Sequence, residues 1–236
     1  MKRHMAIDFL VPLALLSIIT VVFLFSNLDL KLQQLFYTEG RGWTIGSRNF
    51  WSFLYNYGTI PALAMAAIAL VVWLTSFWLH KLQAYRKQAA FIMLAILIGP
   101  GLIVNLIFKD HWGRPRPREI SHFEGAKEFH KVWEKGDSGS GYAFPSGHAA
   151  MGFFVLTPYF ILRDRFRKCA ACFLITGMVY GCVVGLGRML QGQHFASDVV
   201  WAGGFVYLSA AACYYLLGLN RLEKTAAHYR SLATQR

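Results

Sequence analysis

Long runs of apolar residues, separated by short polar segments, dominate this chain. A helix that crosses a bilayer needs about 20 predominantly apolar residues. Six runs are candidates: 6–26, 58–79, 89–108, 147–162, 169–187 and 197–219. The pattern predicts an all-α, polytopic membrane helix bundle with six transmembrane helices, formed by residues 1–236 as a single domain.

The first run follows Met-Lys-Arg-His, which is also typical of the start of a signal peptide. The run is long, however, and the Ser-Asn-Leu-Asp at 26–29 that follows it is a poor cleavage site. We therefore expect this run to be a retained span.

Two segments between the runs are too long to be simple turns. Residues 27–57 mix leucines and aromatic residues with polar ones, a pattern that suits amphipathic pieces lying in the membrane interface. Residues 109–143 are polar and contain several glycines, so they cannot span a bilayer. This second segment is predicted to be an extramembrane loop.

Composition narrows the class of protein. Hydrophobic residues make up 56% of the chain and charged residues only 15%, against about 25% charged in soluble domains. The formal net charge is +12. Such a chain is too apolar to be disordered or to be an ordinary soluble domain. Its basic stretch 109–118 is held between two spans, so we expect no nucleic-acid partner.

The spacing of the cysteines does not indicate a zinc site, because Cys169 and Cys172 form a C-x2-C pair but no second pair completes it. They lie in or beside apolar runs and are predicted to be packing residues of membrane helices: Cys169, Cys172, Cys182 and Cys213.

Basic clusters indicate how the bundle is oriented. Short cytoplasmic loops of membrane proteins are rich in Lys and Arg, and compact clusters of these residues occur at 80–87 and 163–168. We therefore predict that both termini lie inside the cell. The connections on the opposite side carry three clusters of polar residues.

The first cluster, Lys109 to Arg118, holds four cations in ten residues directly after the third run. A solvated basic loop is the simpler interpretation. Two prolines stiffen this backbone, which favours a fixed geometry.

The second cluster, Pro-Ser-Gly-His at 145–148, opens the fourth run. A helix start leaves backbone N–H groups free, and glycine there allows an anion to approach closely. Ser146 and Gly147 are therefore candidates for holding an anion, with His148 one turn into the helix. A simple turn with an interfacial histidine is the alternative.

The third cluster contains Arg188, His194 and Asp198. His194 and Asp198 are four residues apart, so on a helix they would share one face. A carboxylate bonded to one ring nitrogen fixes the tautomer and makes the other nitrogen a better base or nucleophile. A His–Asp pair that only closes a turn is the alternative.

The order of the runs brings the three clusters to one side of the membrane, whichever way the bundle is oriented. Arg and Lys at such a site would bind phosphate. One histidine could attack phosphorus while the other protonates the leaving oxygen. No carboxylate cluster suited to Mg²⁺ accompanies them, so we expect neither a metal nor another cofactor.

Three motifs carry a family resemblance. Lys109 through Arg116-Pro117 reads K-x6-R-P, residues 145–148 read P-S-G-H, and Arg188 to Asp198 reads R-x5-H-x3-D. In this order they resemble the signature motifs of the type 2 phosphatidic acid phosphatase superfamily of membrane lipid phosphatases. The resemblance also covers the six-span layout.

The resemblance implies a role for each motif residue. His194 would be the nucleophile that forms a phospho-histidine, Asp198 would orient it, and His148 would be the general acid. The residues that hold the phosphate would be Lys109, Arg116, Ser146, Gly147 and Arg188. Gly187 stands where the family usually has Ser, a departure that bears on one hydroxyl contact and not on the reaction.

Members of the family act on phosphatidic acid, phosphatidylglycerol phosphate, undecaprenyl pyrophosphate or lipid A. The basic and aromatic loop 118–135 and the size of the chain are most similar to the lipid A phosphatase branch. We therefore expect a lipid phosphate in the bilayer as substrate, at the periplasmic face of a bacterial inner membrane. Hydrolysis of the other lipids and transfer of the phosphate to a lipid acceptor remain open alternatives.

The loop 118–135 contains two histidines, His122 and His130. They are expected to be exposed or to face headgroups.

A non-catalytic membrane protein is the competing class. A transporter or scaffold would not need His148, His194 and Asp198 together. The sequence does not indicate an oligomeric state.

Overall fold

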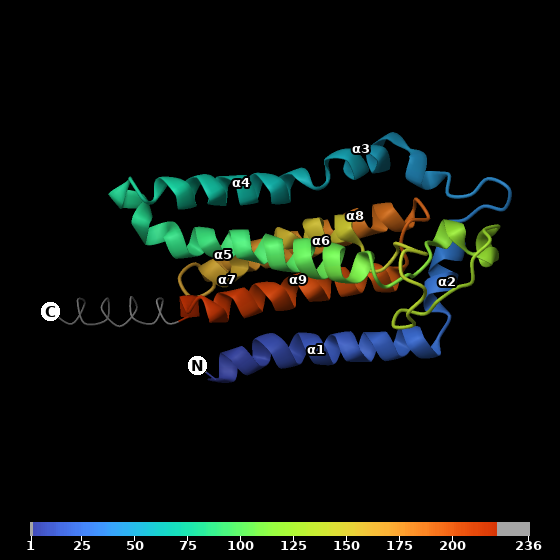
Figure 1. Ribbon diagram of the computed structural model, residues 1–236, viewed down its shortest axis with the longest axis horizontal. Helices are drawn as coiled ribbons and strands as arrows, with labels where there is room; N and C mark the ends of the chain where they lie inside the picture. The colour runs from blue at the N-terminus through green and yellow to red at the C-terminus, as the bar shows by residue number, and fades with distance from the viewer. Residues whose placement is uncertain (1, 221–236) are drawn as a thin grey trace.

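Helices form the regular structure of this protein in the computed structural model, which describes residues 2–220. Within that range the only extended pairings are two isolated bridges, Thr38 with Gly42 and Ile120 with Lys127. In chain order the helices are α1 (Lys2–Phe25), α2 (Leu28–Gln34), η1 (Ile45–Ser47), α3 (Asn49–Tyr57), α4 (Ile60–Thr75), η2 (His80–Tyr85), α5 (Arg86–Ile96), η3 (Leu97–Lys109), η4 (Pro117–Glu119), η5 (Ser121–Phe123), α6 (Gly147–Phe154), α7 (Pro158–Leu162), α8 (Arg167–Met189) and α9 (Ala196–Leu216). The longer ones run along one axis as a bundle (Figure 1). The predicted all-α membrane bundle is confirmed.

Five stretches are long and apolar enough to cross a membrane: His4–Phe25, Asn49–Thr75, His80–Lys109, Arg167–Met189 and Ala196–Leu216. They match five of the six predicted runs. The sixth run, 147–162, is helical but shorter, and it is divided into α6 and α7. The break precedes Pro158, whose ring fits the first turn of a new helix and would remove a backbone hydrogen bond from the interior of a longer one.

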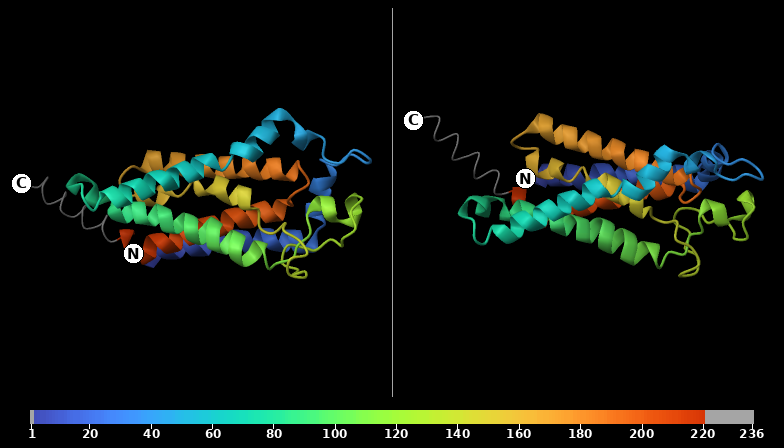
Figure 2. Two further views of the ribbon diagram at one scale, coloured as in Figure 1. Left: turned by 45° about the horizontal axis from the view of Figure 1, so that its top comes forward. Right: turned by 90° about the horizontal axis from the view of Figure 1, so that it is seen from above.

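Helix α6 lies in the middle of the bundle, between α8, α9 and η3 (Figure 2). Glycines make the contact with α8 close. A Cβ added to Gly152 would lie 2.9 Å from the Cα of Gly181, and one added to Gly177 would lie 2.3 Å from the backbone nitrogen of Leu156. Small residues of this kind let helix backbones approach closely in membrane proteins. The helix that begins with Gly147 is therefore held tightly from several sides.

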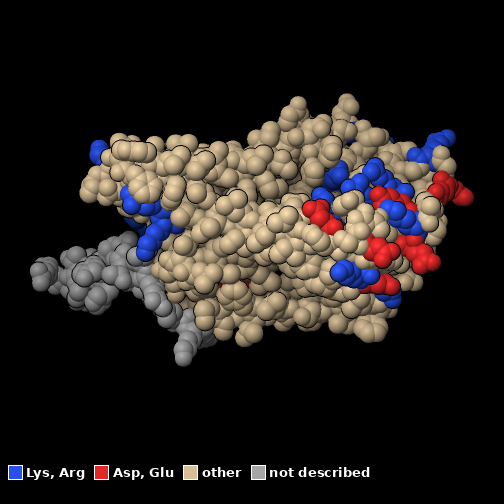
Figure 3. Space-filling view, in the orientation of Figure 1, with Lys and Arg blue, Asp and Glu red and all other residues tan. Residues whose placement is uncertain are grey.

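The outer surface of the bundle is apolar. Leu10, Ile18 and Val71 are 64%, 62% and 59% exposed. Figure 3 shows charged side chains near the two ends of this face, with a broad band between them that is almost free of charge. Apolar surface on this scale would be unfavourable in water. This surface agrees with a multi-pass membrane protein.

The interpretation of the cysteines is wrong for three of the four. Cys169, Cys172 and Cys182 on α8 are exposed, and only Cys213 on α9 is buried. The reason is that α8 buries only one face. Its opposite face carries exposed apolar residues such as Ile175 and Val179.

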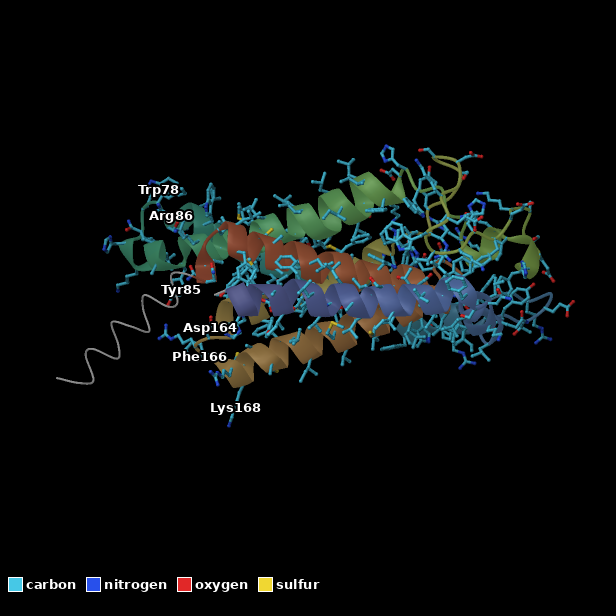
Figure 4. The ribbon with its side chains drawn as sticks, turned by 90° about the horizontal axis from the view of Figure 1, so that it is seen from below. Trp78, Tyr85, Arg86, Asp164, Phe166 and Lys168 are labelled. Atoms are coloured by element: carbon cyan, nitrogen blue, oxygen red, sulfur yellow. The ribbon has the colours of Figure 1, made fainter. Side chains whose placement is uncertain are left out.

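The two ends of the bundle differ. One end holds α2, η1 and the irregular segment between η3 and α6, while the other holds the start of α1 and the connections α4–α5 and α7–α8 (Figure 1). Figure 4 labels residues of these two connections, which lie at the same end of the molecule. The basic clusters 80–87 and 163–168 therefore lie together, as predicted. The predicted position of the C-terminus falls outside the described residues.

Candidate active site

A cavity of about 610 Å³ lies at the end of the bundle that carries α2 and the irregular segment. Its walls come from six helical elements, η1, α3, η3, η4, α6 and α8, and from the loops beside them. They include five of the eight residues singled out in the sequence: Lys109, Arg116, His148, Arg188 and His194. Trp43, Ser47, Tyr55, Arg118 and Gln193 are among the others, and no Asp or Glu lines the cavity. The predicted convergence of the three clusters is confirmed.

Three cations of the predicted set face this space. Lys109 ends η3, Arg116 lies in the irregular segment directly before η4, and Arg188 lies in the last turn of α8. Arg188 donates to the side chain of Gln191, and its guanidinium lies 4.5 Å from the ring centroid of Tyr55. Within the described part of the chain, the buried Nε atoms of Arg116 and Arg188 have no hydrogen-bond partner. Donors held in this way are suited to an anion.

The start of α6 lies beside Lys109. Ser146 is fully buried and caps the helix, its Oγ accepting from the backbone N–H of Ala149 at 3.4 Å. A Cβ on Gly147 would lie 3.3 Å from the Nζ of Lys109 and 2.8 Å from the Oδ1 of Asn105. Glycine therefore leaves room for the lysine side chain. Ser146 supports the helix start and does not line the cavity.

His148 stands at the cavity wall with its ring stacked on Tyr55. The two ring centroids are 5.0 Å apart and the planes differ by 24°. Tyr55 comes from α3, so this helix covers both His148 and Arg188.

His194 is 3% exposed and is fixed by two hydrogen bonds. Its Nδ1 lies 2.6 Å from the carbonyl oxygen of Ala143, and its own carbonyl accepts from the Nε2 of Gln33 at 2.7 Å. A carbonyl can only accept, so Nδ1 carries the proton and Nε2 keeps its lone pair. Burial lowers the pKa of His194, and the nearby Asp198 offsets this only in part. The neutral ring that a nucleophile needs is therefore favoured.

Asp198 lies behind His194 and is fully buried. Its Oδ2 is 3.8 Å from the Nδ1 of His194 and accepts the backbone N–H of Phe195 at 2.7 Å. The two residues do not share a helical face, because α9 begins at Ala196 and His194 precedes it. The pair forms instead because Asp198 caps the start of this helix.

Comparisons with known proteins agree with this geometry. Residues 88–222 match the PAP2 superfamily. The chain belongs to the PAP2 superfamily. The expected enzyme class, a PAP2-type membrane lipid phosphatase that acts on phosphoric monoesters, is thereby confirmed.

Two relatives are similar to this chain in sequence. It is 37% identical over 197 residues to the lipid A 4'-phosphatase of Francisella tularensis subsp. novicida (strain U112), an alignment that covers 82% of this chain and 88% of the relative. It is 33% identical over 132 residues to the lipid A 4'-phosphatase of Rhizobium leguminosarum, covering 54% of this chain and 55% of the relative. No solved structure matches the chain.

The departure at Gly187 has a packing explanation in this PAP2 chain. A Cβ there would lie 3.0 Å from Trp51 and 3.6 Å from Leu54, both on α3. Gly187 thus faces α3 and does not line the cavity. A serine would push against the helix that carries Tyr55.

The loop 118–135 contributes one residue to the PAP2 cavity, Arg118. Further along, Ile120 and Phe123 are buried against Trp43, which itself lines the cavity. His122 is exposed, His130 is half-buried, and neither lines the cavity. Ile120 and Phe123 therefore support the wall through Trp43.

Several residues other than the defined positions of the three PAP2 motifs also build the site. They are Asp29, Gln33, Tyr55, Arg114 and Ala143. Arg114 was visible as a cation in the first cluster. Asp29 and Gln33 lie on α2, inside the segment predicted to be amphipathic, and they point their polar groups into the protein. Ala143 acts through its carbonyl, which no side-chain pattern can reveal.

Residues 2–220 contain no group of three or more His, Cys, Asp or Glu side chains that could hold a metal ion. The charged side chains that line the cavity are four cations, Lys109, Arg116, Arg118 and Arg188. Independence from metal remains a prediction.

Proposed function

We propose that this protein removes a phosphate group from lipid A at the outer face of a bacterial inner membrane, through a phospho-histidine intermediate. The observation that carries the proposal is that two histidines and four cations line one cavity at one end of a membrane bundle.

The cations bind the phosphate first. Lys109, Arg116 and Arg188 surround the place where its oxygens would lie, with the N-terminal end of α6 beside them. Guanidinium groups bind phosphate oxygens through paired hydrogen bonds, and a lysine adds a point charge. These fixed charges also stabilise the negative charge that the equatorial oxygens carry in the transition state.

His194 then attacks. The lone pair on Nε2 forms a bond to phosphorus while the bond from phosphorus to the lipid oxygen breaks. The electron pair of the breaking bond passes to that oxygen, and His148 donates the proton that it needs. The ring of His194 keeps its Nδ1 proton, donated to the carbonyl of Ala143, and becomes positively charged.

Water completes the reaction. His148, now neutral, takes a proton from a water molecule that attacks phosphorus on the face opposite Nε2. The bond between phosphorus and Nε2 breaks, inorganic phosphate leaves, and His194 returns to its neutral form. Both histidines end in their starting protonation states.

Lipid A as the substrate is supported by the relatives and by the cavity. The Francisella relative is named a lipid A 4'-phosphatase and aligns over 88% of its length. Trp43, Tyr55 and Arg118 extend the cavity wall beyond the phosphate-binding set, so there is room and surface for a sugar phosphate headgroup. The basic clusters at the opposite end of the bundle support an outward-facing site.

The test is to offer the purified protein in detergent a panel of lipid phosphates and to measure free phosphate. The panel contains lipid A, phosphatidic acid, phosphatidylglycerol phosphate and undecaprenyl pyrophosphate, with the His194→Ala variant as control. Lipid A should be hydrolysed fastest, and EDTA should leave the rate unchanged. A labelled lipid acceptor distinguishes phosphotransfer from hydrolysis, and a preference for another member of the panel would reject lipid A.

A further inference from the structure

Behind the cavity, a chain of buried polar groups links Asp198 to α2. Arg114 donates from Nη1 to the Oδ1 of Asp198 at 2.5 Å and from Nη2 to the Oδ2 of Asp29 at 2.9 Å. Ser197 donates to Asp29 twice, from its backbone N–H at 3.0 Å and from Oγ at 2.5 Å. The Nη1 of Arg114 also donates to that Oγ at 2.8 Å. No partner of this network is water-exposed: Arg114, Asp198 and Ser197 are 0% exposed and Asp29 is 3% exposed.

The network decides where the Asp198 carboxylate points. One of its oxygens is held by Arg114 and the other by the backbone N–H of Phe195. The ring of His194 is farther away, at 3.8 Å, so it does not fix the carboxylate. Arg114 in turn is held by Asp29 and donates from Nε to the carbonyl of His130 at 2.9 Å.

The network also decides the charge behind His194. Two carboxylates, Asp29 and Asp198, share one guanidinium, which leaves one net negative charge. Burial alone would lower the pKa of Arg114, but Asp198 and Asp29 outweigh it and raise the pKa, so the guanidinium stays charged. When Nε2 bonds to phosphorus, the ring of His194 gains a positive charge. A net negative charge behind the ring would stabilise it, and more strongly in a buried site than in water.

We infer that Asp29 and Arg114 are positioning residues that act through Asp198 to promote phosphorylation of His194. The inference rests on the proposed role of His194. Asp29 lies outside residues 88–222, the part of the chain that matches the PAP2 superfamily. The helix α2 thereby becomes part of the catalytic apparatus, although it contributes no side chain to the cavity wall.

The test compares Asp29→Asn with Asp8→Asn in the purified full-length protein. Asp8 is a matched control because it is also buried and also paired with an arginine, Arg163, at 2.6 Å, but at the opposite end of the bundle. Phospho-enzyme formation is followed by rapid quench with p-nitrophenyl phosphate, so the result does not depend on which lipid is the substrate. Thermal unfolding in detergent measures the loss of stability for both variants.

We expect Asp29→Asn to slow phospho-enzyme formation by about 10–100-fold, the range seen when a hydrogen-bonding partner of an active-site ligand is removed. KM should change by less than about threefold, because the phosphate-binding cations are untouched. Asp8→Asn should lose comparable stability and keep its rate. Equal rates for the two variants would overturn the inference.

A double-mutant cycle tests whether Asp29 acts through Asp198. In an Asp198→Asn background, Asp29→Asn should slow the reaction by less than about threefold, because groups that act as a unit are not additive. An undiminished effect in that background would show that Asp29 acts by another route. If Asp29→Asn does not fold, Ser197→Ala removes the two hydrogen bonds that the Ser197 hydroxyl makes with Asp29 and Arg114, without changing charge. It should slow the same step by about three- to tenfold while its KM stays constant.

Orthovanadate separates this inference from the proposed function. It adopts the five-coordinate geometry of phosphoryl transfer, so it reports on His194 without turnover. Asp29→Asn should weaken vanadate binding at least tenfold and leave inorganic phosphate binding within about twofold. If Asp29→Asn weakens the binding of vanadate and of inorganic phosphate equally, the inference is overturned. If the wild-type protein binds vanadate tightly but does not hydrolyse lipid A, only the lipid A assignment is overturned.

Discussion

At the residue scale, the two histidines differ in how they are held. His194 is buried and fixed through Nδ1, so only Nε2 can react. His148 is stacked on Tyr55 and stands at the wall of the cavity. The difference suits a nucleophile that must not move and an acid that must reach a leaving group. It also makes their roles separable by experiment.

His194→Ala should abolish both turnover and formation of the phospho-enzyme, because the variant lacks the Nε2 atom that forms the bond to phosphorus. His148→Ala should slow the first step about 10²–10⁴-fold with lipid A, the usual contribution of a general acid. It should slow p-nitrophenyl phosphate far less, since that leaving oxygen needs little protonation. Acid-labile phosphate on the His194→Ala protein, or equal slowing of both substrates by His148→Ala, would mean that the roles are assigned wrongly.

The pH dependence of kcat/KM should reflect the environment of His194. Burial lowers its pKa from the ordinary value of about 6.5, so the neutral nucleophile persists below that pH. The acid limb of kcat/KM should therefore lie below pH 6.5. Lys109→Ala removes a cation that lowers this pKa and should move the limb to higher pH, whereas Asp198→Asn should move it to lower pH.

The measurement for this prediction is kcat/KM for p-nitrophenyl phosphate from pH 4 to 8. Ionisation of the substrate is the same for every variant, so differences between variants belong to the enzyme. If the acid limbs of kcat/KM coincide in the wild-type protein, Lys109→Ala and Asp198→Asn, the assignment of the limb to His194 is contradicted.

At the element scale, α2, α3 and the loop 118–135 enclose a site whose motif residues lie elsewhere. The motif residues could be predicted from the sequence because each is next to an end of an apolar run, and the order of the runs brings those ends together. The contribution of α2 could not be predicted. Asp29 meets Arg114 and Ser197 across long stretches of chain, and an isolated acid in an amphipathic segment gives no sign of this.

The break between α6 and α7 also escaped prediction. The run 147–162 is continuously apolar, so its pattern does not show where a helix stops. Pro158 was a possible signal, but a proline can either kink a span or start a new helix. Packing of α6 against the glycines of α8 adds a constraint that one run alone cannot reveal.

The loop 118–135 should affect substrate choice mainly through Arg118. Arg118→Ala should raise KM for lipid A about 10–150-fold, as expected for loss of a charged hydrogen bond, and change KM for short-chain phosphatidic acid by less than about twofold. The control is Arg41→Ala. Arg41 is a cation at the same end of the bundle, but it does not line the cavity. Equal increases for the two lipids would show that Arg118 serves phosphate binding in general.

At the scale of the whole molecule, the cavity and the basic connections lie at opposite ends of the bundle. Trp78 is 79% exposed and Tyr85 is 57% exposed at the basic end, where aromatic residues commonly mark the level of the headgroups. The site therefore faces the side opposite to the basic clusters. The position of the cavity follows directly from the motif order, whereas the sidedness depends on these clusters.

Single cysteines test the sidedness in intact cells, after the four native cysteines are replaced by alanine. A membrane-impermeant maleimide should label Glu128→Cys, in the loop near the cavity, and should not label Lys81→Cys until the inner membrane is opened. Both positions are exposed in the structure, so protection reports the membrane. The reverse labelling pattern would place the cavity in the cytoplasm and exclude a periplasmic substrate.

The helix pair α3–α4 has a consequence for the membrane around the protein. The stretch Asn49–Thr75 contains 27 residues, about 40 Å of helix at about 1.5 Å per residue, against a hydrocarbon core of about 30 Å. A span that is longer than the hydrocarbon core is thick fits the bilayer by tilting or kinking. The end of this stretch nearest the cavity carries Tyr55, which contacts both His148 and Arg188. Between α3 and α4, the backbone carbonyl oxygen of Gly58 accepts a hydrogen bond from the hydroxyl of Tyr180 at 2.9 Å. We therefore expect the thickness of the surrounding lipid to influence, through Tyr55, the two residues proposed as general acid and phosphate ligand, His148 and Arg188.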